Sequence, residues 1–121
     1  MKIKQLQKIT HKISKEKGFW NGTIVVEPEG VNPSFMFEDI NYGEKLMLIV
    51  TELSEALEAI RSNNKQKKGG KWKKDTFEDE LADALIRICD LAEACKINLE
   101  WQIKNKLEYN KKRPYKHGKK F

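Results

Sequence analysis

Apolar residues recur every three or four positions in four stretches of the chain, the spacing of an α-helix with one buried face. The first stretch covers residues 2–17, where lysines lie opposite the apolar positions. The second runs from Asn41 to about Ser62, and the third and fourth begin after Asp75 and Asn98. Because each of these three residues is an Asn or Asp placed just before an apolar stripe, we expect them to cap the helices.

The segments between the stripes differ in character. Residues 18–43 contain four glycines and two prolines, which predicts a long connection with an extended piece at residues 23–26. Residues 63–75 are polar and lysine-rich, and Pro114 should end the last helix. These features predict an all-α fold, an antiparallel four-helix bundle forming one domain over residues 1–121, with a basic tail from about residue 114.

Charge is distributed unevenly along the chain. The formal net charge is +6, and the lysines concentrate in residues 1–17, 65–74 and 104–121, with an acidic middle. Such a chain can hold a polyanion through both ion pairs and a metal, although the lysines can equally be solvated ends and a solvated loop. No run of roughly 18 apolar residues and no apolar leader occurs, so we expect a cytoplasmic protein that binds no membrane. Cys89 and Cys95, six residues apart, are expected to stay reduced.

Two acidic pairs are the candidate chemistry. Glu52 and Glu55 lie three residues apart on the second helix, and Glu80 and Asp83 lie three apart on the third. If these helices pack side by side, the four carboxylates converge on a site suited to Mg²⁺, with Mn²⁺ as a substitute. The alternative is a charged helix surface.

Position on the helical wheel separates these acids. Glu52 falls beside Ala56 and Ala59, where a carboxylate is costly unless a cation compensates its desolvation. Asp83 falls near Arg87, four residues on, so a surface salt bridge explains it equally well.

Three stretches together resemble a known family: LIVTELSEALEAIR (48–61), FEDELADALIRICDLAE (77–93) and KLEYNKKRPYKHGKKF (106–121). They are similar to the MazG-like all-α nucleoside triphosphate pyrophosphohydrolases, whose signature is E-x-x-E followed by E-x-x-D. The resemblance covers about residues 44–117 and implies that Glu52, Glu55, Glu80 and Asp83 hold Mg²⁺.

The resemblance also implies the reaction. A (deoxy)nucleoside triphosphate is hydrolysed to the monophosphate and pyrophosphate, which in this family can serve to clear non-standard nucleotides. Glu52 or Glu55 is the expected catalytic base. Lys106, Asn110 and Arg113 are expected to bind phosphates because they share one face of the fourth helix. Trp20, before the long loop, is the expected contact to the base.

Other readings of the sequence stay open. The same fold can act on another phosphoanhydride such as phosphoribosyl-ATP, and a basic helical nucleic-acid-binding module without catalysis would use the lysine clusters instead. Nucleic acid is the less favoured partner, because no recognition helix stands out and an acidic pocket repels phosphodiesters. The second helix is apolar on more than one side, which predicts a homodimer or a dimer of dimers.

Overall fold

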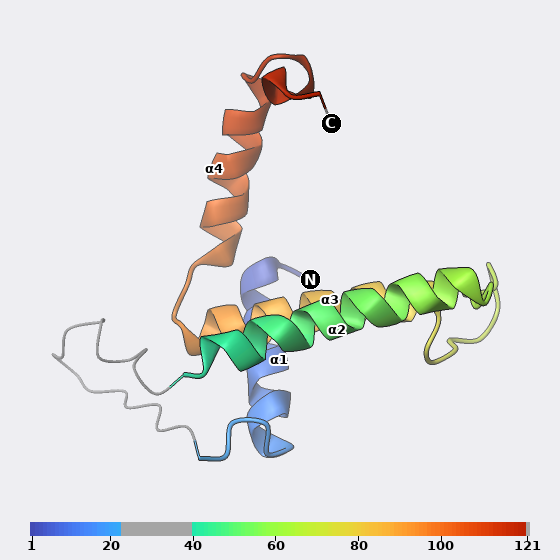
Figure 1. Ribbon diagram of the computed structural model, residues 1–121. Helices are drawn as coiled ribbons and strands as arrows, with labels where there is room; N and C mark the ends of the chain where they lie inside the picture. The colour runs from blue at the N-terminus through green and yellow to red at the C-terminus, as the bar shows by residue number, and fades with distance from the viewer. Residues whose placement is uncertain (23–39, 121) are drawn as a thin grey trace, which may run out of the picture.

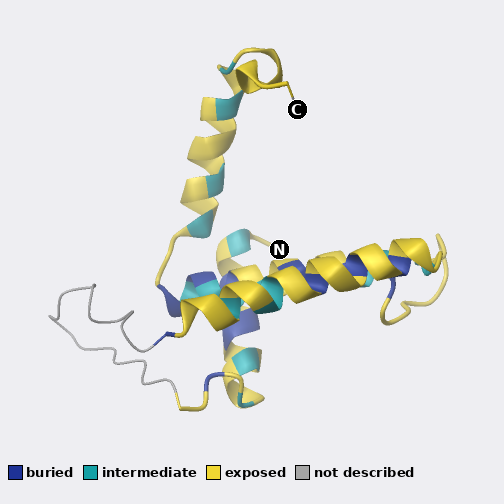
Figure 2. Cartoon of the chain, in the orientation of Figure 1, coloured by how far each residue is buried: buried dark blue, intermediate teal, exposed yellow. Residues whose placement is uncertain are grey.

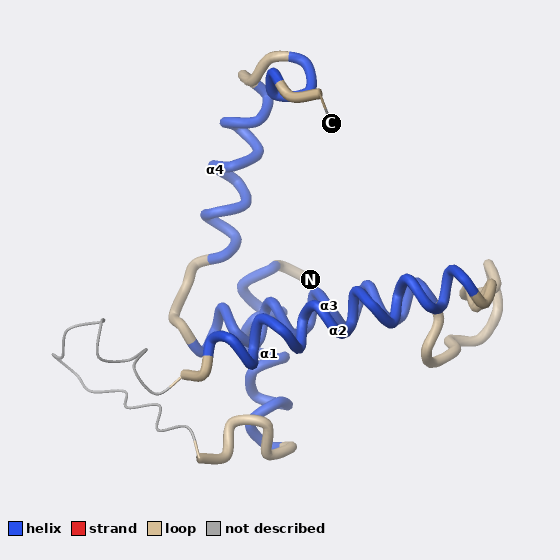
Figure 3. Tube along the Cα trace, viewed as in Figure 1, coloured by secondary structure: helices blue, strands red, loops and turns tan. Residues whose placement is uncertain are grey.

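The computed structural model describes residues 1–22 and 40–120, and within them the fold is all-helical with no strand (Figures 1 and 3). The predicted extended piece at residues 23–26 lies outside the described residues. The all-α prediction, with four helices, is confirmed. The helices are α1 (Ile3–Glu16), α2 (Tyr42–Arg61), α3 (Phe77–Ala94) and α4 (Leu99–Lys111), followed by a short 3-10 helix, η2 (Tyr115–Gly118).

The helix starts follow from side-chain capping. Asn41 and Asn98 each accept a hydrogen bond at 3.0 Å from the backbone N–H three residues on, as predicted. At α3 the prediction was wrong by one residue, because Thr76 is the cap and its hydroxyl accepts from the N–H of Asp79 at 3.2 Å. Asp75 has φ 63°, outside the extended conformation of a cap, and donates its own N–H to Asp79.

Helices α2 and α3 run antiparallel along their length, and α1 crosses α3 (Figure 1). The contact between α2 and α3 is made by small side chains, which allow the two backbones to approach closely. The buried residues of these two helices, apart from two carboxylates treated below, are Ala56, Ala59, Ala84, Cys89, Ala92 and Ala94. The packing of these helices is consistent with a bundle. Cys89 and Cys95 are free, buried thiols, in agreement with the sequence.

The large aliphatic side chains of α2 and α3 lie outside this contact, contrary to their expected place in the core. We call them the α2–α3 apolar face, and each is between 37% and 53% exposed. Figure 2 shows exposed residues along much of α2. The face consists of Leu46, Val50, Leu53, Leu57 and Ile60 on α2 and Leu81, Leu85 and Ile88 on α3.

A second cluster forms where α1, the end of α3 and the start of α2 meet. Trp20 and Ile40 pack with Ala94 and Cys95 there. The buried Gln7 of α1 donates to the carbonyl of residue 97 at 2.8 Å and accepts from the N–H of residue 99 at 3.3 Å. Its side chain thus fastens α1 to the turn between α3 and α4.

Helix α4 makes few contacts with the other helices. Its main contact among the described helices is with α1. None of its residues is buried, and it extends away from the other helices (Figure 1). Its position therefore depends on the turn rather than on a core. No helix among the described residues is long and apolar enough to cross a membrane.

Candidate metal centre

Three of the four predicted carboxylates converge between α2 and α3. Glu52, Glu80 and Asp83 each bring a carboxylate oxygen within 4.8 Å of the others. Glu52 and Glu80 are buried, at 8% and 4% exposure, and Asp83 is half-buried. Carboxylate oxygens are the ligands that hard divalent cations prefer, so the donor set fits Mg²⁺ or Mn²⁺.

Glu80 lies at the centre of the cluster and is the least satisfied of its members. Its Oε2 atom is buried and has no hydrogen-bond partner among the described residues. Burial raises the pKa of Glu80 to about 7, and hydrogen bonds with Glu55 and Glu52, together with the negative charges of these two residues, add to the shift. A buried acceptor among like charges is costly without a cation. A bound metal would remove both the unpaired oxygen and the repulsion.

The pKa of Asp83 is also raised above its usual value. Its burial is the main cause, and the charges of Asp79 and Glu52 add to it, whereas nearby Arg87 opposes the rise. The spacing suggested a salt bridge between Arg87 and Asp83. In the structure Arg87 pairs with Glu52 instead, because its Nε donates to Glu52 Oε1 at 2.6 Å. Asp83 thus remains available to a cation.

This ion pair across the helices gives Glu52 a partner that the sequence analysis missed. It explains part of why Glu52 tolerates burial without a metal. A carboxylate has two oxygens, so pairing with Arg87 and ligating a cation are compatible. The signal was present, since Arg87 falls on the same side of its helix as Asp83, but spacing within α3 cannot show a partner on α2.

Glu55 stands next to this group rather than within it. Its side chain is exposed, and it acts on Glu80 strongly enough to raise the pKa of that carboxyl. Asp79 is a further acid that the sequence analysis missed, and it forms a second close group with Asp75 and Glu80. Its spacing of four from both Asp75 and Asp83 was the available signal.

A cavity of about 400 Å³ opens beside the cluster. Glu52, Asp83 and Arg87 line one part of it, and α1 together with Phe19 and Trp20 lines another. Its volume lies in the range of small-molecule sites, which combine apolar walls with a few polar groups. A ligand in this cavity would have Glu52 and Asp83 of the acidic cluster in its wall.

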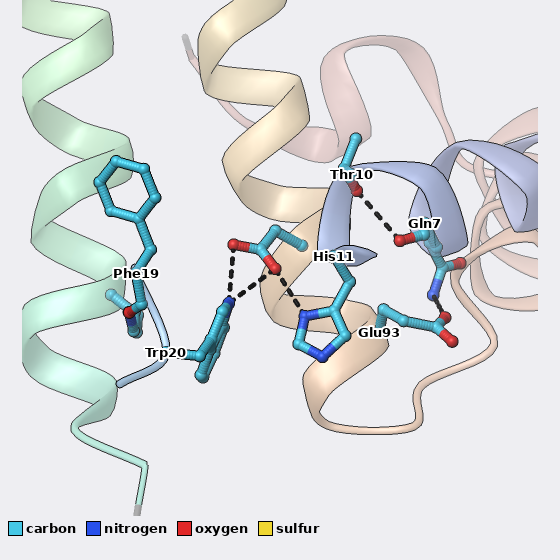
Figure 4. A network of polar contacts seen from close by, with 8 residues as sticks. Gln7, Thr10, His11, Phe19, Trp20 and Glu93 are labelled. Carbon is cyan, nitrogen blue, oxygen red and sulfur yellow. Dashed lines mark hydrogen bonds and ion pairs between the residues drawn. The ribbon is translucent and has the colours of Figure 1, made fainter. Parts of the chain in front are cut away.

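Trp20 lines this cavity, as the sequence prediction requires, but it is 5% exposed and firmly held. Its indole N–H donates to both oxygens of Asp90, at 2.9 and 3.1 Å. His11 Nδ1 lies 2.7 Å from the same carboxylate, and Lys45 Nζ lies 4.1 Å from the indole centroid. Figure 4 shows Trp20 and His11 turned toward this shared carboxylate, while Phe19 lies apart. Phe19, 58% exposed, is the more accessible aromatic of the wall.

The predicted phosphate ligands lie elsewhere. Lys106 Nζ and Arg113 Cζ gather over the ring of Tyr109, at 4.7 and 5.4 Å from its centroid. The Oδ1 atom of Asn110, also on α4, is buried and has no hydrogen-bond partner in the part of the chain that the structure describes. No residue of α4 lines the cavity, and the helix extends away from it (Figure 1). The single chain therefore does not bring these residues to the acidic cluster.

No family model, curated protein or solved structure matches the chain.

Proposed function

We propose that this chain is a Mg²⁺-dependent hydrolase that converts (deoxy)nucleoside triphosphates to the monophosphate and pyrophosphate. The observation that carries the proposal is the cluster of Glu52, Glu80 and Asp83, of which Glu52 and Asp83 line a cavity of about 400 Å³. The unpaired Glu80 Oε2 supports a cation at this place. Resemblance of the two acidic motifs to the MazG-like family supports the reaction.

Glu52, Glu80 and Asp83 would hold the metal with Glu55 beside them, as the motif implies. The ion would neutralise phosphate oxygens and acidify a bound water. Glu55 is the better placed general base of the two considered. Glu52 is paired with Arg87 at 2.6 Å, whereas the side chain of Glu55 is exposed, so that a water can reach it.

The cavity gives the nucleoside a place next to its phosphates. Its lining is mainly apolar and includes Phe19, Trp20 and side chains of α1. A base bound against Phe19 or Trp20 would leave its phosphates to extend toward Asp83 and the metal. Because Trp20 already uses its N–H on Asp90, it would contribute a wall rather than a hydrogen bond.

The proposal includes self-association, as a homodimer or a dimer of dimers. The eight aliphatic side chains of the α2–α3 apolar face are each roughly half exposed. Together they offer on the order of 700 Å² per copy, close to the roughly 800 Å² per partner of a specific interface. Helix α4 carries Lys106, Asn110 and Arg113 away from the acidic cluster of the same chain. If these residues bind phosphate, they would therefore do so at the acidic cluster of a neighbouring copy.

The test is a pyrophosphate-release assay over ordinary and modified nucleoside triphosphates and phosphoribosyl-ATP, with Mg²⁺ or EDTA. We expect release that requires the metal and falls at least about 100-fold in Glu55→Gln and Asp83→Asn, since a general base and a metal ligand each contribute this much. Glu58→Gln is the matched control, because Glu58 is an exposed acid of α2 that pairs with exposed Arg61 at 4.0 Å. Full activity in both site variants, or in EDTA, would refute the proposal.

A further inference from the structure

The connector between α2 and α3 carries a surface that the proposed hydrolysis does not use. We call residues 63–76 the basic loop. It contains six lysines, all exposed, and no acidic residue from 62 to 74. Trp72 stands among them with 73% of its surface exposed. A tryptophan so exposed leaves a large apolar ring in water, which is unfavourable unless something covers it.

The exposure of Trp72 is fixed by the loop's own hydrogen bonds. Gln66 Nε2 donates to the carbonyl of Lys71 at 2.7 Å, and Gln66 Oε1 accepts from the N–H of Lys73 at 2.9 Å. One side chain thus holds the backbone immediately before and after Trp72. The N–H of Gln66 in turn donates to Glu78 Oε2 at 2.8 Å, which anchors this clamp to α3.

The base of the loop is closed in a similar way. Asn64 Nδ2 donates to the carbonyl of Asp75 at 2.6 Å, and Asn64 Oδ1 accepts from Lys73 Nζ at 2.8 Å. At the tip, the N–H of Gly70 donates to the carbonyl of Lys67 at 2.9 Å, and Gly69 takes φ +73°. These hydrogen bonds give the loop a defined conformation in which the indole of Trp72 faces the solvent.

A hollow of about 420 Å³ lies beside the basic loop. The loop contributes Lys67, Lys68, the two glycines and Trp72 to its lining, and α3 contributes Glu78 and Asp79. A planar group entering the hollow would meet Trp72 and the side chains of Lys67 and Lys68, which also line it. The two glycines keep side chains out of that side of the hollow.

We propose that the basic loop is a docking surface for single-stranded nucleic acid, with a base against Trp72 and backbone phosphates on the lysines. Every base presents a π-face, and lysines are point charges that read no base edge, so the recognition would be independent of sequence. A duplex fits less well, because its bases are already stacked. Six lysines along ten residues exceed what one triphosphate neutralises, which favours a chain of phosphates over a free nucleotide.

The first experiment measures anisotropy of a labelled oligothymidylate of about ten nucleotides, a length within the usual site sizes. The full chain is used, in EDTA, so that binding is separated from metal-dependent hydrolysis. Trp72→Ala should weaken binding about tenfold, as loss of one stacked base does, and Trp72→Phe should retain most of it. Trp101→Ala is the matched control, since Trp101 is 57% exposed on α4.

The second experiment measures the salt dependence of the same binding. Lys67→Ala/Lys68→Ala should reduce the slope of log K against log salt by about 0.7 for each lysine that contacts a phosphate. Lys119→Ala/Lys120→Ala removes the same charge from the tail and should leave the slope nearly unchanged.

Three results would overturn the proposal. The first is equal affinity of Trp72→Ala and the unaltered chain for the oligonucleotide. The second is an equal change of slope in both lysine pairs. The third is that a duplex of the same length, or thymidine triphosphate, displaces the labelled oligothymidylate as well as unlabelled oligothymidylate does at the same concentration of nucleotides.

Discussion

Replacing Glu80 by Gln should have opposite effects on stability with and without metal. Glutamine keeps the shape of the side chain but removes its charge, and its amide N–H₂ can donate to the neighbouring carboxylates. The rise in the pKa of Glu80 from 4.5 to about 7 corresponds to about 3 kcal/mol, and solvent entering past half-buried Asp83 reduces this to about 1–2 kcal/mol. In EDTA at pH 8, Glu80→Gln should therefore be more stable than the unaltered chain by that amount.

With Mg²⁺ the order should reverse. Mg²⁺ at a hundred times its Kd would stabilise the folded state by about 2.7 kcal/mol. The variant loses most of this stabilisation because it lacks the Glu80 carboxylate that coordinates the metal. Urea unfolding, followed by circular dichroism at one protein concentration, gives both differences. Glu58→Gln should show neither effect. Two results would refute the assignment of Glu80 to a metal site. One is that Glu80→Gln is less stable than the unaltered chain in EDTA, and the other is that the difference in free energy of unfolding is the same with and without Mg²⁺.

Three further predictions concern the same residues and the apolar face. In EDTA, the unfolded chain releases the proton of Glu80 near pH 4.5 while the folded chain keeps it to about pH 7, so the free energy of unfolding should fall as pH rises through this window and then level off; a rise would contradict the pKa shift. Arg87→Met leaves Glu52 buried without its partner and should cost about 1–2 kcal/mol in EDTA, with a smaller loss in Mg²⁺, measured by the same unfolding curves. Leu57→Glu in the α2–α3 apolar face should lower the mass in light scattering to that of one chain, whereas Leu107→Glu, on exposed α4, should not; an unchanged mass in Leu57→Glu would exclude this face as the interface.

Local signals explain why the helices were predictable. The caps at Asn41 and Asn98 depend on hydrogen bonds within four residues, so the sequence places them directly. Thr76 was missed in favour of Asp75 because both are capping residues, and only the left-handed φ of 63° at Asp75 decides between them. That angle is set by the basic loop, which closes through contacts up to twelve residues apart.

Contacts between helices were less predictable. The burial of Glu52 followed from its alanine neighbours, but its partner Arg87 lies on another helix, 35 positions away. Which residues meet across α2 and α3 depends on how the two helices slide against each other. Similarly, the sequence sets where α4 begins but not its direction, because the turn before it includes Lys96 at φ 54° and no residue of α4 is buried.

The acidic cluster and the apolar face have one structural origin. Ala56, Ala59 and Ala84 let α2 and α3 approach so closely that carboxylates on both helices meet, and the same approach leaves the larger aliphatic side chains on the outside. A contact made of alanine and cysteine buries little apolar area, so it contributes less stability than one of leucine. Two additions would compensate: a cation that removes the repulsion around Glu80, and a second copy that covers the apolar face. Because both would act on the α2–α3 pair, metal binding and self-association should strengthen each other.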